Sequence, residues 1–219
     1  MCDDYNHCKA YLPQADIIKN WGESYYNKMY SKIESAVYDV LGKMITYNDK
    51  PINAVFHAVS CGKTASALEV WGSDIAYLQS VDCTFDKSSK DGISYLILTK
   101  KEFSDVFYDS LGVILPSDDS AWIGEINYHP SGLVDTINIG GTMYEGTHIR
   151  KLFSLKSAAF DIEISNNKIK FNVYGYGHGV GMSQNGANEL AKQGYDYASI
   201  LEYFYTDVKI TDYKIEKTA

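Results

Sequence analysis

The spacing of hydrophobic residues predicts helices near both ends of the chain and short strands between them. From Asp16 to Leu41, apolar and aromatic residues recur every three or four positions, which is the period of an amphipathic helix. Residues 44–59 alternate apolar and polar side chains around a central turn, which predicts a hairpin. Toward the other end, two short helices are predicted to begin at the capping residues Ser183 and Asp196.

The middle of the chain has a different pattern of hydrophobic and polar residues. A capping box of Thr99 and Glu102 predicts one helix there, and most of the remaining pattern is that of β-hairpins. We therefore expect an inserted β-rich subdomain over 93–168, within a core made of 1–92 and 169–219. The predicted fold class is α+β, with a core of short strands and helices at both ends of the chain.

Four glycines at alternate positions follow a predicted strand, Phe171–Tyr174. Glycine admits positive φ and lets other atoms approach the backbone, so this run suits a loop that lines a cleft. The resulting strand–loop–helix frame makes His178, Ser183 and Gln184 candidate site residues. The spacing matches neither the dinucleotide nor the phosphate-loop motif. A plain glycine-rich connection, with His178 merely hydrogen-bonded in place, is the alternative.

A second candidate segment lies earlier, at the end of the predicted hairpin. Ser60 offers a hydroxyl and Gly62 an unencumbered backbone N–H, which a sugar hydroxyl or acetamido group can bond, and His57 lies just before them. A Ser60–His57 nucleophilic pair is an alternative, although the sequence places no third orienting group beside it. Cys61 as a nucleophile, or paired with Cys83, is a further alternative.

The first residues combine two thiols and an imidazole. Cys2, His7 and Cys8 have the ligand chemistry that zinc prefers, although their spacing fits no standard two-cysteine finger. A Cys2–Cys8 disulfide and two free thiols are the alternatives.

Charge narrows the classes of partner. The formal net charge is −8 and there is no basic run, so nucleic acid and anionic membrane surfaces are poor partner candidates. No apolar stretch is long enough to span a membrane, and the first residues have neither the charged nor the apolar region of a signal peptide.

The C-terminal stretch 177–210, GHGVGMSQNGANELAKQGYDYASILEYFYTDVKI, is long and specific. It resembles the C-terminal signature of the stage II sporulation protein D (SpoIID) family, relatives of the amidase enhancer LytB. Residues 42–52 and 56–72 are similar to two further phrases of that family, with Cys61 standing where a glycine is usual. A last phrase of the family is matched by Gly140, Gly141, Gly146, Arg150 and Leu155.

The resemblance implies a peptidoglycan lytic transglycosylase of endospore formation. Such enzymes cleave denuded MurNAc–GlcNAc strands during engulfment and leave a 1,6-anhydroMurNAc end. One carboxylic acid protonates the leaving oxygen and then accepts a proton from the 6-hydroxyl of the sugar. In the family this acid is a glutamate in an N-terminal phrase that the chain does not contain, and Glu69 is only a fallback for it. We therefore expect the chain to bind glycan and not to cleave it.

The resemblance also implies ligand residues. In this reading, zinc is held by Cys2, His7 and Cys8 together with an upstream histidine that is not in this chain. The implied glycan-binding residues are His57, Ser60, Gly62, His178, Ser183 and Gln184. Both segments can line one groove only if the strand within 52–59 lies near Phe171–Tyr174, with His57 and His178 facing a shared trough.

Family members act outside the cytoplasmic membrane and are tethered by an N-terminal membrane helix, so we expect that Met1 is not the biological start. The expected partners are peptidoglycan glycan strands and other wall enzymes of engulfment, such as an amidase. A non-catalytic amidase enhancer or wall scaffold is an alternative function. A zinc-dependent hydrolase centred on Cys2, His7 and Cys8 is a third.

Overall fold

The described chain, residues 11–213 of a computed structural model, divides into two compact units. One unit comprises residues 11–44 and 211–213, and the other comprises residues 45–210. No helix in the described part of the chain is both long enough and apolar enough to cross a membrane.

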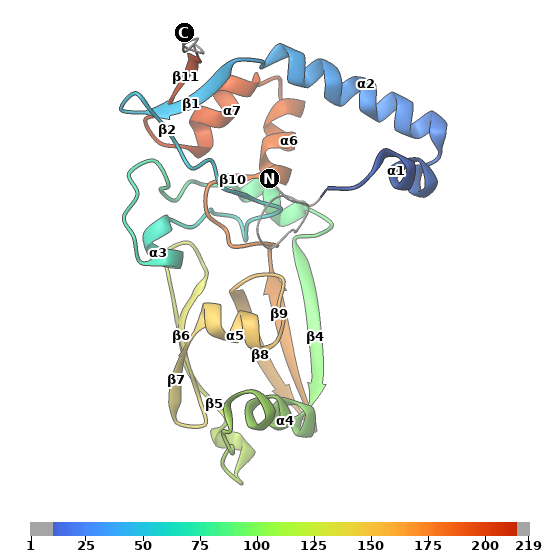
Figure 1. The fold of residues 1–219 in the computed structure, drawn as a ribbon. Coiled ribbons are helices and arrows are strands. Elements are labelled where there is room, and N and C mark those ends of the chain that lie inside the picture. Colours follow the sequence, from blue (N-terminus) through green and yellow to red (C-terminus); the bar gives the residue numbers. More distant parts are fainter. Residues whose placement is uncertain (1–10, 214–219) are drawn as a thin grey trace. The chain divides into compact units, whose positions relative to one another are not determined.

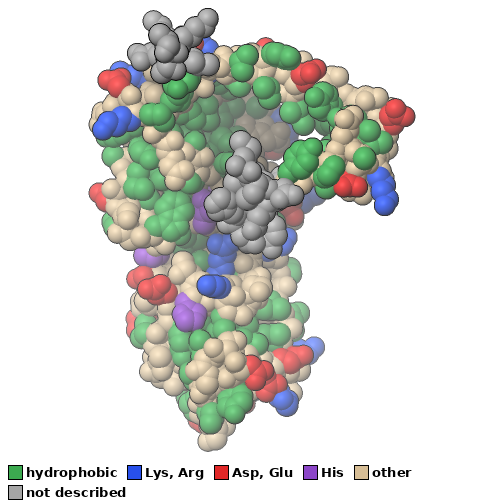
Figure 2. Space-filling model, viewed as in Figure 1, with side chains coloured by type: hydrophobic (Ala, Val, Ile, Leu, Met, Phe, Trp, Pro, Cys, Tyr) green, Lys and Arg blue, Asp and Glu red, His purple; other side chains and the backbone are tan. Residues whose placement is uncertain are grey.

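The smaller unit contains two helices that meet at Gly22. These are α1 (Gln14–Trp21) and α2 (Glu23–Asp39), and Gly22, with a φ of +79°, breaks the predicted helical stretch into two. Tyr26 is buried, but most of the large apolar side chains of both helices are exposed (Figure 2). The exposed set includes Trp21, Tyr25, Tyr30, Ile33, Val37 and Tyr38.

Two antiparallel sheets with helices form one part of the larger unit (Figure 1). The first has the strand order β4-β9-β8, formed by β4 (Ile93–Thr99), β9 (Lys168–Tyr174) and β8 (Ala159–Ser165). The second has the order β5-β6-β7, formed by β5 (Ile123–Tyr128), β6 (Val134–Ile139) and β7 (Thr142–Glu145). The associated helices are α4 (Lys100–Leu111), α5 (Gly146–Leu152) and the 3₁₀ turn η2 (Asp119–Ala121).

Aromatic side chains fill the core of this part. Phe103 stacks on Phe153 at a centroid distance of 5.1 Å, and Phe153 contacts Phe171 at 5.0 Å. All three are buried, and aromatic contacts of this kind add to the free energy gained by burying apolar area. Ile137 and Ile149 join the same cluster from the second sheet and its helix.

A second hydrophobic cluster lies where the C-terminal helices pack on the loops after residue 55. It includes Leu78, Leu190 and Phe204, all buried. The elements around it are β3 (Phe56–His57), α3 (Ala67–Trp71), the 3₁₀ helix η1 (Thr84–Ser88), β10 (Met182–Ser183), α6 (Gln184–Lys192) and α7 (Tyr197–Phe204). A small sheet has the order β11-β1-β2, formed by β11 (Lys209–Asp212), β1 (Lys43–Tyr47) and β2 (Lys50–Pro51).

The mixed α+β class is confirmed. The predicted hairpin is wrong in its second strand, because β2 contains only two residues and Phe56–His57 pairs in parallel with Met182–Ser183 instead. Tertiary pairing with a distant segment has replaced the local partner. The contact-based units have boundaries unlike the predicted ones, and the finer division at 93–168 stays a prediction.

Candidate functional site

The two predicted motif segments meet in the structure. β3 and β10 pair in parallel, with His57 beside Ser183, and single bridges join Val59 to Tyr176 and Ala65 to Val180. The two motif segments therefore lie side by side, but the strand that contains Phe171–Tyr174 pairs with Ile93–Thr99 and Ala159–Ser165 and not with residues 52–59. The shared glycan trough stays a prediction.

The alternate glycines are the reason that the two segments can approach so closely. A Cβ added at Gly181 would lie 2.2 Å from the Val55 carbonyl oxygen, and one at Gly177 would lie 2.7 Å from the His57 Cβ. Both glycines also have positive φ. The glycine run therefore fits one loop against the backbone of the other.

His57 is a buried imidazole, 4% exposed, at this junction. Its Nδ1 lies 3.1 Å from the Val180 carbonyl oxygen and can donate a proton to it. Burial, opposed by that hydrogen bond, lowers the pKa of His57 to about 4. The ring is therefore neutral at pH 7, which leaves Nε2 as an acceptor, and this buried atom has no hydrogen-bond partner among the described residues.

His178 and Trp71 extend the site toward solvent. The His178 ring centroid is 5.9 Å from that of His57 and 5.3 Å from that of Trp71. The Val180 amide donates to His178 Nδ1 at 3.1 Å, which fixes the orientation of the ring. Trp71 is 44% exposed, so it offers an aromatic surface beside His178.

Asp86 connects both segments, although no motif in the sequence marks it. Its Oδ2 accepts hydrogen bonds from the Ser60 amide and the Ser183 hydroxyl, both at 2.7 Å, and its Oδ1 accepts one from Asn185 Nδ2 at 2.8 Å. Burial alone would raise the pKa of this carboxyl, but the hydrogen bonds from Ser183, Asn185 and Ser60 outweigh it and lower the pKa. Asp86 is thus a buried carboxylate that ties the loop after β3 to the start of α6.

The predicted polar residues differ in their exposure. Ser183 is fully buried, caps α6 by accepting from the Gly186 amide at 3.1 Å, and donates to Asp86. Ser60 is also buried and accepts from the Gly62 amide at 3.2 Å. Gln184 is exposed and begins α6. Glycan contacts by these residues, and by His57, Gly62 and His178, stay predictions.

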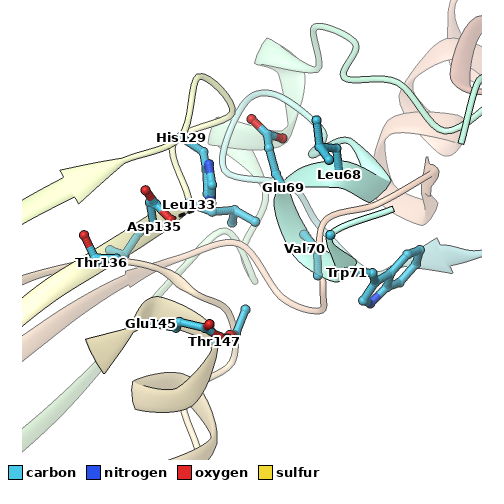
Figure 3. A pocket seen from close by; sticks show the side chains of 12 residues that line it. Leu68, Glu69, Val70, Trp71, His129, Leu133, Asp135, Thr136, Glu145 and Thr147 are labelled. Atoms are coloured by element: carbon cyan, nitrogen blue, oxygen red, sulfur yellow. Dashed lines mark hydrogen bonds and ion pairs between the residues drawn. The ribbon is translucent and has the colours of Figure 1, made fainter. Parts of the chain in front are cut away.

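A cavity of about 490 Å³ adjoins Trp71 (Figure 3). Carboxylates of Glu69, Asp135 and Glu145 line it, and Asp135 lies 3.4 Å from His129 Nε2. The Glu69 carboxylate accepts from the Ser66 amide at 2.8 Å, completing the capping box of α3, and from the Ser131 amide at 3.3 Å. These contacts hold Glu69 in a structural role at the cavity wall, and its fallback role as the acid stays a prediction.

Both cysteines of the described chain are free thiols, so the Cys61–Cys83 pair is absent from this structure. Cys61 lines a second cavity of about 330 Å³ with Ser60, Lys87 and Tyr174. Its thiol donates to the Ser131 carbonyl oxygen at 3.1 Å, and burial raises its pKa. Burial also raises the pKa of the Cys83 thiol. Because the thiolate is the nucleophilic form, the raised pKa values make both Cys61 and Cys83 poor nucleophiles.

Among residues 11–213, no group of three or more His, Cys, Asp or Glu side chains is arranged to hold a metal ion. Cys2, His7 and Cys8, the predicted zinc ligands, lie outside the described residues.

Comparison with known proteins identifies the family. No family model matches the chain. Stage II sporulation protein D of Bacillus subtilis (strain 168) is 38% identical over 213 residues, which is 97% of this chain and 60% of that protein. The Bacillus amyloliquefaciens protein of the same name is 35% identical with the same coverage. The amidase enhancer of Bacillus subtilis is 25% identical over 84% of this chain and 33% of its own length.

The chain therefore spans about 60% of the length of the curated sporulation proteins that it matches. Since the match covers 97% of this chain, it includes both glycine-and-histidine segments that meet in the structure. The chain is a member of the stage II sporulation protein D family, as its motifs predict.

Proposed function

We propose that this chain forms the glycan-binding part of a peptidoglycan lytic transglycosylase that remodels the cell wall during engulfment in endospore formation. The observation that carries the proposal is the chain of ring contacts from His57 through His178 to Trp71, which itself lines a cavity rich in polar side chains. Carbohydrate sites commonly combine an aromatic face with a few fixed hydrogen-bonding groups, because sugars have both apolar C–H faces and hydroxyl edges.

The hydrogen-bonding groups have definite roles in this proposal. His57 Nε2 is a buried acceptor in a neutral ring, so it would accept from a sugar hydroxyl or a bridging water only if glycan binding displaced the side chains that cover it. Glu69 is held by two backbone amides, so it would accept from sugar hydroxyls at the cavity wall. Asp86 does not reach the glycan and would position Ser60 and the start of α6.

Cleavage by the whole protein would need a carboxylic acid to protonate the leaving oxygen and then accept the proton of the 6-hydroxyl, which leaves the 1,6-anhydroMurNAc end. The 219 residues contain no match to the glutamate phrase that the family resemblance assigns to this role. We expect this chain to bind MurNAc–GlcNAc strands and to release no anhydro-sugar from denuded glycan. Release of anhydro product that is lost on Glu69→Gln would place the acid at Glu69 instead.

Titration with tri-N-acetylchitotriose, followed by NMR chemical shifts, tests the binding. We expect Trp71→Ala to weaken it about tenfold, which is the upper range of one aromatic contact. Trp21→Ala is the matched control, because Trp21 is similarly exposed, at 49% against 44%, but lies on α1. Equal affinities of wild type and Trp71→Ala, or no binding at millimolar ligand, would contradict the proposal.

A non-catalytic role as an amidase enhancer is the second candidate. The similarity to the Bacillus subtilis amidase enhancer favours it. A purified amidase acting on sacculi, with and without this chain, separates the two functions. Faster peptide release without glycan binding by the chain would favour the enhancer.

Zinc bound by Cys2, His7 and Cys8 is a further part of the proposal, resting on ligand chemistry and the family resemblance. Bound metal measured by mass spectrometry should fall in Cys8→Ser and not in Cys61→Ser. On the basis of the same family resemblance, we also propose that the protein acts outside the cytoplasmic membrane and contacts other enzymes of the cell wall.

A further inference from the structure

β4 is an edge strand of its sheet, and it is open along its outer side. In the order β4-β9-β8 it has one neighbour, and all seven of its residues pair with β9 without a register shift (Figure 1). Among the described residues, no strand pairs with its outer side. A regular strand of seven residues with free backbone donors and acceptors is a template for another strand.

The usual protection of sheet edges is missing at β4. The opposite edge strand, β8, has charged residues at Asp161 and Glu163, and the edge strand β5 of the second sheet is interrupted by register shifts. Charges and bulges of this kind discourage pairing with another chain. β4, with the sequence ISYLILT, has no charge, proline or bulge.

The exposed face of β4 is apolar. Ile93, Tyr95 and Ile97 alternate along it and are 46%, 62% and 55% exposed. Lys170 Nζ of β9 lies 4.9 Å from the Tyr95 ring centroid, a cation–π contact that helps to hold this exposed ring in place. A strand that paired with the outer side of β4 would contact this apolar surface.

We propose that β4 pairs antiparallel with β4 of a second copy of this chain, about a two-fold axis at Leu96. This register overlaps all seven residues and joins the two three-stranded sheets into one of six strands. Tyr95 then lies opposite Ile97 of the other copy, twice over, and pairs of aromatic and β-branched residues at directly opposed positions stabilise antiparallel sheets. A two-fold axis also closes the assembly, so that no open edge is left for further chains.

The charges at the two ends of β4 suit this arrangement. Asp91 lies just before the strand, 3.8 Å from Lys156, and Lys101 lies just after it, 2.6 Å from Asp105. Their side chains are still 68% and 82% exposed, so both can also face a second chain. Antiparallel pairing brings the first end of one strand to the last end of the other, so opposite charges meet at both ends. Parallel pairing would instead bring like charges together.

Sedimentation of the 219-residue protein over micromolar to millimolar concentrations tests the proposal. We expect a monomer–dimer equilibrium that weakens at least about tenfold in the double variant Tyr95→Lys with Ile97→Lys, because like charges directly opposed in a sheet are destabilising. The control is Tyr108→Lys with Ile114→Lys, two residues that are 60% and 83% exposed outside the strand. This control should dimerise as the wild type does.

The register has its own test. When Tyr95→Cys and Ile97→Cys chains are mixed and oxidised, mass spectrometry should find the peptide linked from 95 to 97. The yield of this 95–97 peptide should exceed the yield of the 95–95 peptide from an oxidised sample of the Tyr95→Cys chain alone. A protein that stays monomeric throughout, or a dimer that the lysine pair at β4 leaves unchanged, would overturn the proposal. Neither result would affect the test of glycan binding with Trp71→Ala.

Discussion

Replacing Asp86 with asparagine should destabilise the larger unit more than any other isosteric change of a single polar side chain at the site. The carboxylate accepts hydrogen bonds from Ser60, Ser183 and Asn185 while fully buried. Asparagine keeps one oxygen and adds an NH₂ donor, so at least one of these buried donors loses its acceptor.

The lost hydrogen bonds set the expected decrease in the free energy of unfolding. One unsatisfied buried donor costs about 1–3 kcal/mol, and hydrogen bonds to a charged group contribute about 1.5–3 kcal/mol each. We expect Asp86→Asn to lower the free energy of unfolding by about 2–4 kcal/mol. For a unit of this size the melting temperature should fall by roughly 5–15 °C.

Urea unfolding followed by tryptophan fluorescence measures this loss. The control is Asp82→Asn, since Asp82 is exposed and lies only a few residues earlier in the sequence. Because the folded pKa of Asp86 is lowered, its contribution is present above the unfolded pKa and is lost as pH falls through the folded pKa. The gap between wild type and Asp86→Asn should therefore narrow in acid. A melting temperature within a degree of wild type would refute the assigned role of this carboxylate.

Three further predictions concern the same junction. Folding lowers the pKa of His57 from its ordinary value of 6.5 to about 4, so the unfolded chain binds more protons between these two values. The free energy of unfolding should therefore decrease by about 3 kcal/mol as pH falls from 6.5 to 4. His57→Gln should flatten this part of the plot of unfolding free energy against pH, measured by urea unfolding. Gly181→Ala should cost about 3 kcal/mol or more in thermal unfolding, since its Cβ would lie 2.2 Å from a backbone oxygen, whereas Gly194→Ala, with positive φ but open space, should cost about 1–2 kcal/mol. Cys61 should react with iodoacetamide at pH 8 much more slowly than an unfolded thiol, because burial raises its pKa, and a rate equal to that in urea, read by mass spectrometry, would contradict this.

Local features of the sequence were sufficient for several elements. The capping box of Thr99 and Glu102 starts α4 as predicted, because both hydrogen bonds join residues only three positions apart. Ser183 caps α6 for the same reason. The family was also recognisable from the sequence, since its signature is a continuous stretch of residues.

The tertiary structure alone decided the composition of the site. Asp86 belongs to no motif, and its partners Ser60, Ser183 and Asn185 lie 26, 97 and 99 residues away in the sequence. The carbonyl that fixes the His57 ring is 123 residues away in the sequence, and no periodic pattern of residues can reveal a contact over that separation. The sequence determined which short segments form helices and which carry chemistry, because hydrogen bonds between near neighbours govern those choices. Which segments pair, and which carboxylate is buried between them, depends on the packing of the whole unit.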